Sequence, residues 1–103
     1  MMRITAVAEL FSDLGEAELI TWVERGWVCP EPAGNEWIFQ EVDVARVRLI
    51  HDLRASMDVD DEALPVVLSL LDQVYDLRGQ LRALMQAVQS QPEAVRRAIL
   101  AAL

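Results

Sequence analysis

Three sets of residues in this chain could do chemistry: one histidine, His51, one cysteine, Cys29, and the carboxylate run Asp58, Asp60, Asp61 and Glu62. A histidine can activate a nearby thiol, and clusters of both residue types hold zinc, but one of each, remote in sequence, favours neither. The acidic run lacks the central glycine and the terminal glutamate spacing of a calcium loop. There is also no glycine-rich phosphate loop. We therefore expect no enzyme, no cofactor and no metal site.

Simpler structural roles are expected for these residues. Cys29 follows the apolar Val28 and is predicted to be a small buried hydrophobe. His51 is predicted to lie on a helix surface or at an interface. The acidic run is expected to cap a helix and stabilise its dipole.

The formal charge of −8 is distributed very unevenly along the 103 residues. Residues 44–103 carry seven arginines and eight carboxylates. Residues 1–43 carry only Arg3 and Arg25 against nine carboxylates: Glu9, Asp13, Glu16, Glu18, Glu24, Glu31, Glu36, Glu41 and Asp43. Phosphate neutralisation supplies most nucleic-acid affinity, so this stretch should repel a duplex. The excess charge either serves solubility alone or steers a basic partner to this region.

Composition limits the class of protein further. The chain is 53% apolar and long enough for one domain, or for one domain with an extension. A single cysteine allows no intramolecular disulfide. No apolar run approaches a membrane span, and the N-terminus lacks the signal-peptide pattern. We therefore expect a cytoplasmic protein that does not engage a membrane.

The first 57 residues are predicted to form a winged helix-turn-helix domain. One helix is expected over Thr5–Leu14, with Thr5 as its N-cap, and a second over Glu16–Arg25, between Gly15 and Gly26. The apolar face of the first should contain Val7, Leu10, Phe11 and Leu14. The apolar face of the second should contain Leu19, Ile20, Trp22 and Val23.

A two-stranded β wing is expected next. Its strands are predicted at Trp27–Val28 and Trp37–Phe39, flanking the turn-rich stretch from Pro30 to Asn35. The three tryptophans are expected in the core. Trp27 and Trp37 could instead anchor a partner, since tryptophan is enriched in interface hot spots.

Two further helices are predicted at Glu41–Ser56 and at Asp61–Gln89, the second with Pro65 in its first turn. The core positions of the earlier helix should be Val44, Val47, Leu49, Ile50 and Leu53. Apolar residues in the later helix alternate three and four apart, as in a coiled-coil seam: Val67, Leu70, Val74, Leu77, Leu81, Leu84 and Val88. We expect a homodimer through this seam. The alternative is that the long helix folds back onto its own domain.

A short C-terminal helix, Pro92–Ala102, should follow the capping-box pattern Ser90–Glu93. Val95, Ile99 and Leu103 lie on one side of it, and it could cover the seam, extend the dimer contact or stay mobile. The expected fold class is mainly α: a winged helix-turn-helix with a small wing, a long coiled-coil-type helix and a short terminal helix. The expected segments are residues 1–57, 58–89 and 90–103.

Four stretches in this order resemble a known family: Leu19–Pro32, Trp37–Phe39, Val44–Arg54 and Val59–Leu84. Their order and spacing resemble the bacterial chaperone modulators, the CbpM family, a divergent branch of the MerR-like winged-helix fold. The resemblance covers roughly residues 3–89. Nothing is carried over to the tail from Ser90.

The resemblance implies a non-enzymatic protein that binds the J-domain of a CbpA-type co-chaperone. Binding would block stimulation of a DnaK-type chaperone and weaken the co-chaperone's own DNA binding, and the partner could bring the protein to the nucleoid. MerR regulators proper read DNA with cations in the second helix and wing. The matching positions here hold Glu16, Glu18, Thr21 and Glu36, which makes promoter binding an unfavourable alternative.

Contact residues are expected from exposure and charge alone. The predicted J-domain surface consists of Glu9, Asp13, Glu16, Glu18, Glu24, Glu36 and Trp37. A second acidic patch, Asp58–Glu62 with Asp72, stays open as an alternative. Two other functions compete: a MerR-like DNA-binding transcription regulator, and an antitoxin-like or adaptor module that captures a foreign helix with its seam.

Overall fold

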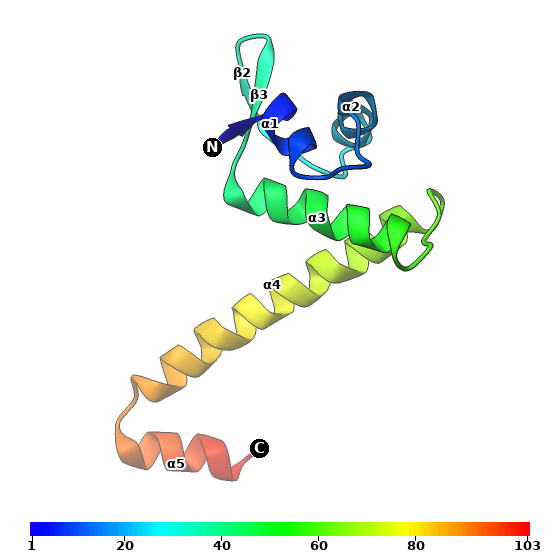
Figure 1. The fold of residues 1–103 in the computed structure, drawn as a ribbon. Coiled ribbons are helices and arrows are strands. Elements are labelled where there is room, and N and C mark those ends of the chain that lie inside the picture. Colours follow the sequence, from blue (N-terminus) through cyan, green and yellow to red (C-terminus); the bar gives the residue numbers. More distant parts are fainter. The chain divides into compact units, whose positions relative to one another are not determined.

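The computed structural model describes all residues, 1–103, and consists mainly of helices (Figure 1). The elements in chain order are β1 (Met2–Arg3), α1 (Ile4–Glu9), α2 (Glu16–Glu24), β2 (Glu31–Ala33), β3 (Glu36–Phe39), α3 (Glu41–Ala55), α4 (Leu64–Gln89) and α5 (Glu93–Ala101). The chain divides into two compact units, Met1–Val66 and Val67–Leu103, and α4 runs through the boundary. The predicted fold class is confirmed, with differences in individual elements.

The first helix is shorter than predicted. It begins at Ile4 with Arg3 as its N-cap and ends at Glu9, instead of spanning Thr5–Leu14. The chain then tightens, because the N–H groups of Leu10 and Phe11 donate to carbonyls only three residues back. Leu10 therefore leaves the apolar face and is 49% exposed. The second helix begins at Glu16 after Gly15, as predicted, but Ile20 on its expected apolar face is 36% exposed.

The wing contains a third strand that the sequence did not indicate. The antiparallel order is β1-β3-β2, with Met2 opposite Phe39 and Pro32 opposite Trp37. The predicted strand at Trp27–Val28 is wrong: both residues are buried in the core, and the outer strand is Glu31–Ala33. A two-residue turn at Gly34 and Asn35 joins β2 to β3, and Gly34 has a φ of +64°, which glycine adopts at little cost.

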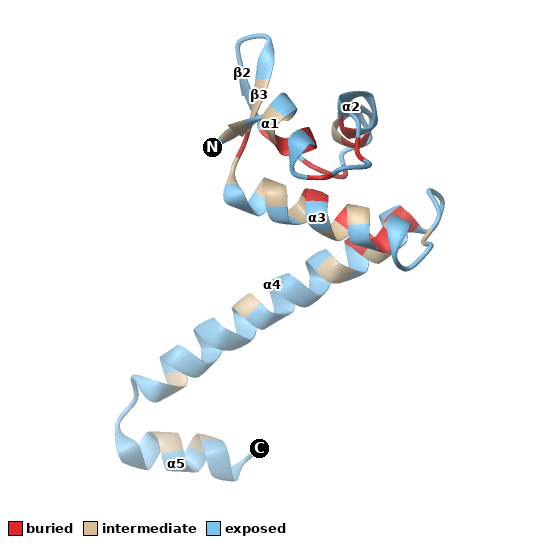
Figure 2. Ribbon diagram, viewed as in Figure 1, coloured by how far each residue is buried: buried red, intermediate tan, exposed pale blue.

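The hydrophobic core of the first unit lies where α1, α2, β3 and α3 meet (Figure 2). Its fully buried side chains are Val7, Leu19, Trp22, Val28, Phe39, Val47, Ile50 and Leu64. The start of α3 is fixed because the N–H of Gln40 donates to Asp43 Oδ2 at 2.8 Å. Val47, Ile50 and Leu53 of α3 are buried as predicted, whereas Val44 and Leu49 are half-buried.

The long helix begins at Leu64, three residues later than predicted. Asp60 caps the turn before it, since its Oδ1 accepts from the N–H of Ala63 at 2.8 Å. Pro65 is the second helical residue, where its missing N–H costs no hydrogen bond. The predicted capping box at Ser90–Glu93 is wrong: the Ser90 hydroxyl donates to the carbonyl of Ala87, and Pro92 is the N-cap of α5.

Candidate functional site

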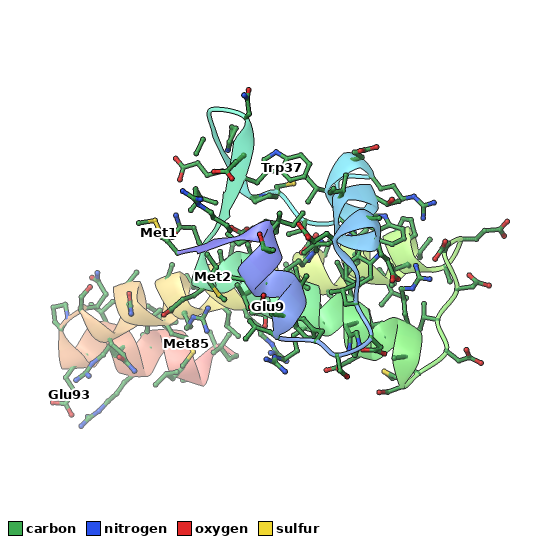
Figure 3. All side chains as sticks on the ribbon, turned by 45° about the horizontal axis from the view of Figure 1, so that its top comes forward. Met1, Met2, Glu9, Trp37, Met85 and Glu93 are labelled. Atoms are coloured by element: carbon green, nitrogen blue, oxygen red, sulfur yellow. The ribbon has the colours of Figure 1, made fainter.

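The predicted partner surface occupies three places in the first unit. Asp13, Glu16 and Glu18 surround the turn between α1 and α2, with Glu9 at the end of α1. Glu24 lies at the far end of α2, about 12 Å along the helix from Glu16. Glu36 and Trp37 belong to β3. All six carboxylates are exposed and Trp37 is half-buried. Figure 3 shows Glu9 on α1, and the ring of Trp37 on the side of β3 where α2 lies.

Asp13 is connected to α3 through the only histidine. Its Oδ1 lies 2.7 Å from His51 Nε2, and the His51 ring lies 5.1 Å from the ring of Phe11. The hydrogen bond to His51 lowers the pKa of the Asp13 carboxyl below its usual value. His51 was predicted to lie on a helix surface or at an interface. It is half-buried and connects α3 to the turn between α1 and α2.

A second connection centres on Asp61, in the segment before α4. Asp61 accepts from Arg25 at 3.2 Å and from Arg54 at 2.5 Å, and thus joins the end of α2 to the end of α3. Arg54 also lies 3.9 Å from Glu18. Asp13, Glu18, His51 and Arg54 line one small pocket, of about 190 Å³, beside the turn between α1 and α2. These pairings could not be predicted from the sequence, because their members lie on different elements.

The remaining arginines of the first unit are engaged as well. Arg3 pairs with Glu36 at 3.5 Å, and Arg46 Nε donates to the carbonyl of Trp27 at 2.9 Å. The Arg48 guanidinium lies over the Phe11 ring at 5.1 Å. By contrast, Glu9, Glu16 and Glu24 have no ion-pair partner. The charges that remain unpaired on the predicted partner surface are therefore negative.

The charge asymmetry follows the division into units. Met1–Val66 contains five arginines and 14 carboxylates, a formal charge of −9, whereas Val67–Leu103 contains four arginines and three carboxylates, a charge of +1. The whole negative excess belongs to Met1–Val66, which we call the winged unit. A field of that sign attracts cationic surfaces and repels phosphate.

Trp22 and Trp27 belong to the core as predicted, whereas Trp37 is half-buried, so only Trp37 of the wing pair is accessible to a partner. The prediction that Cys29 is buried is wrong: the thiol is exposed. Gly26 has a φ of +77°, the two residues that follow it enter the core, and Val28 takes the buried position next to Cys29.

Comparison with known families shows that residues 4–86 match the MerR HTH family regulatory proteins. The chain belongs to this family. No curated protein matches it, and no solved structure does. The match supports the MerR-like part of the resemblance described above, and a regulatory family of this kind is non-enzymatic in character. It ends before α5, so α5 is outside the part of the chain that defines the family.

A helix-turn-helix that binds a duplex needs cations to neutralise the phosphates. In this MerR-family chain the first turn of the second helix of that motif, α2, instead carries Glu16 and Glu18. Arg25, at the C-terminal end of α2, is 3.2 Å from Asp61 and 5.1 Å from the Trp27 ring. Neither α2 nor the wing therefore presents an uncommitted cation.

The predicted self-association seam of this MerR-family chain lies on α4. Its members Leu70, Val74, Leu77, Leu81 and Leu84 are between 41% and 62% exposed. Val67 and Val88 are half-buried. No helix of the chain is both long and apolar enough to cross a membrane. Two features thus remain to be explained: the negative charge of the winged unit and the exposed apolar seam of α4.

Proposed function

We propose that this chain is a chaperone modulator that binds the J-domain of a CbpA-type co-chaperone through the acidic surface of its winged unit. The proposed contacts are Glu9, Asp13, Glu16, Glu18, Glu24, Glu36 and Trp37. The observation that carries the proposal is the state of the charges: the five arginines of this unit are engaged within the chain, while Glu9, Glu16 and Glu24 have no partner.

The negative charge of the winged unit favours a cationic protein as the partner. A unit with a formal charge of −9 accelerates encounters with a cationic protein surface and opposes encounters with phosphates. J-domains present a basic helix to their chaperone. An acidic surface bound to this helix would prevent the J-domain from stimulating the DnaK-type chaperone. The bound protein would also weaken the co-chaperone's contact with DNA. The resemblance of Leu19–Pro32 and Val44–Arg54 to the CbpM family supports this choice of partner.

A MerR-like transcription regulator is the second candidate, and the family match over residues 4–86 favours it. This function needs cations that can neutralise phosphates, since these supply most of the affinity for a duplex. The engagement of Arg3, Arg25 and Arg54 with carboxylates of the same chain argues against it.

Titration calorimetry with an isolated J-domain tests the proposal. The variant Glu9→Gln/Glu16→Gln/Glu24→Gln removes three unpaired charges from the proposed surface and is expected to weaken binding about tenfold. The matched control Glu31→Gln/Glu41→Gln/Asp76→Asn removes the same charge from exposed positions elsewhere and should bind nearly as the unmodified chain does. Equal weakening by both variants would show that net charge matters and the proposed surface does not.

A further inference from the structure

The second unit, Val67–Leu103, contains a cleft between its two helices. Leu68 is the single buried residue of this unit, and Figure 2 shows α4 and α5 exposed along most of their lengths. After the segment Ser90–Pro92, α5 turns back toward α4 (Figure 1), and the cleft that the two helices enclose has a volume of about 740 Å³. Binding sites for small molecules commonly have volumes of about 300–1,000 Å³ and mostly apolar walls. The cleft therefore has the size of a small-molecule site.

Apolar side chains of both helices form the walls of the cleft. α4 contributes four of them, including Leu84, and α5 contributes Ile99, Leu100 and Leu103. This lining differs from the predicted apolar side of α5, because Leu100 lines the cleft and Val95 does not. α5 begins at Glu93, after the family match has ended at residue 86. The cleft thus depends on a helix that lies outside the region matched to the family.

The charged residues of the cleft gather at one end of it. Glu93 is the first residue of α5, directly after the turn between the helices, and Arg96 and Arg97 follow within about one helical turn. Leu81 and Leu103, the lining residues farthest along the two helices from this turn, are both apolar. The cleft therefore has a polar end beside the turn and an apolar body beyond it.

One cation at the polar end has no partner within the chain. A guanidinium nitrogen of Arg97 lies 2.6 Å from Oε1 of Glu93, so these two charges offset each other. The Arg96 side chain, by contrast, makes no ion pair, and its buried Nε has no hydrogen-bond acceptor. A buried donor without an acceptor costs free energy, and a ligand that supplies the acceptor removes this cost. Arg96 therefore favours a ligand with an anionic group at this end of the cleft.

We propose that the cleft binds an amphipathic carboxylate with a linear apolar tail, its head group on Arg96 and its tail between Leu84 and Leu100. A guanidinium donates to a carboxylate in a planar and often bidentate geometry, and the apolar walls remove the tail from water. From Leu81 to Gln89 the cleft extends about 12 Å along α4, which suits a tail of medium length. An apolar segment of another protein would leave the Arg96 donor unpaired, so charge complementarity favours the carboxylate. The inference does not depend on the J-domain proposal.

Titration calorimetry of the full chain with decanoate, kept below its micelle concentration, tests the site. From hexanoate to decanoate the affinity should rise about fourfold for each added methylene, since the tail leaves water. Arg96→Met removes the cation but keeps an apolar side chain, and should weaken decanoate binding about tenfold. The matched control Arg82→Met removes the same charge from an exposed position of α4 outside the cleft and should bind decanoate nearly as the unmodified chain does. No binding, equal effects of the two variants, or equal affinity for the cationic decyltrimethylammonium would overturn the proposal.

Nuclear magnetic resonance of the unmodified full chain locates the ligand without any substitution. Decanoate should shift the Nε–H signal of Arg96 and the methyl signals of Leu84 and Leu100. The methyl signals of Leu70, which belongs to α4 but does not line the cleft, should stay unchanged. If the Leu84 and Leu100 methyls instead contact another protein chain that decanoate does not displace, that chain is the occupant of the cleft and the proposal is wrong.

Discussion

Oδ1 of Asp13 lies 2.7 Å from Nε2 of His51, 38 residues further along the chain. This contact ties the turn between α1 and α2 to α3, and it does so within the acidic surface. Asp13 therefore helps to hold the helix-turn-helix in place, and it also belongs to the proposed partner surface.

The contact predicts how Asp13 titrates. Its pKa should lie below the usual 3.8 because His51 donates to the carboxylate, and His51→Phe should raise it toward that value while keeping an aromatic ring beside Phe11. Because the pKa is lowered in the folded chain, the stabilisation is present above the unfolded value and is lost as the pH falls through the folded one. Titration of the Asp13 carboxyl carbon by nuclear magnetic resonance measures this. An identical pKa in both proteins would contradict the assignment.

Asp61 is expected to stabilise the winged unit by linking Arg25 to Arg54. Asp61→Asn removes both ion pairs and should lower the free energy of unfolding by about 1 kcal/mol, since the side chains are one-third to one-half exposed. The control is Asp58→Asn in the same segment. Asp58 has a φ of +57°, which asparagine tolerates well, so this change should be neutral or slightly stabilising. Urea unfolding compares the two variants, and equal loss in both would exclude the linking role.

Two glycines should respond oppositely to alanine. Gly34→Ala places a side chain at a φ of +64° in the hairpin turn and should cost about 1 kcal/mol. Gly79→Ala lies inside α4, where an added Cβ meets nothing within 4 Å, and should stabilise the helix by up to about 1 kcal/mol. Thermal unfolding followed by circular dichroism measures both. A destabilising Gly79→Ala would mean that this face of α4 is covered.

The helix-turn-helix layout should regain duplex binding when its charge is reversed. Glu16→Lys/Glu18→Lys/Glu36→Lys changes α2 and the wing from anionic to cationic at three positions. We expect weak, sequence-independent DNA binding whose logarithmic salt slope is no steeper than about −3. Fluorescence anisotropy with a labelled duplex at several salt concentrations provides the test. Failure to bind would indicate that these positions do not face a docked duplex.

Local signals in the sequence predicted most helices well. Gly15 before Glu16 fixed the start of α2, and the periodic apolar residues fixed Val47, Ile50 and Leu53 as core positions of α3. Contacts between residues far apart in the sequence could not be predicted from such local patterns. The pairing of Met2 with Phe39 depends on two strands meeting across the domain, and it could not be read from a two-residue strand.

The candidate site was predictable in outline only. Exposure of the carboxylates followed from their positions on the helices, because charged residues are rarely buried. Their partners did not, because Asp13–His51 and Asp61–Arg25 join exposed polar residues that no periodic pattern relates. Cys29 was predicted to be buried beside Val28, but only Val28 takes the interior position.

Separate titrations with the two possible ligands test the central claim most directly. The full chain is titrated at physiological salt with an isolated J-domain and, separately, with a random duplex, and the J-domain affinity is remeasured at high salt. We predict J-domain binding that weakens as salt rises and no measurable duplex binding. Tight duplex binding at physiological salt, with the J-domain unbound, would contradict it.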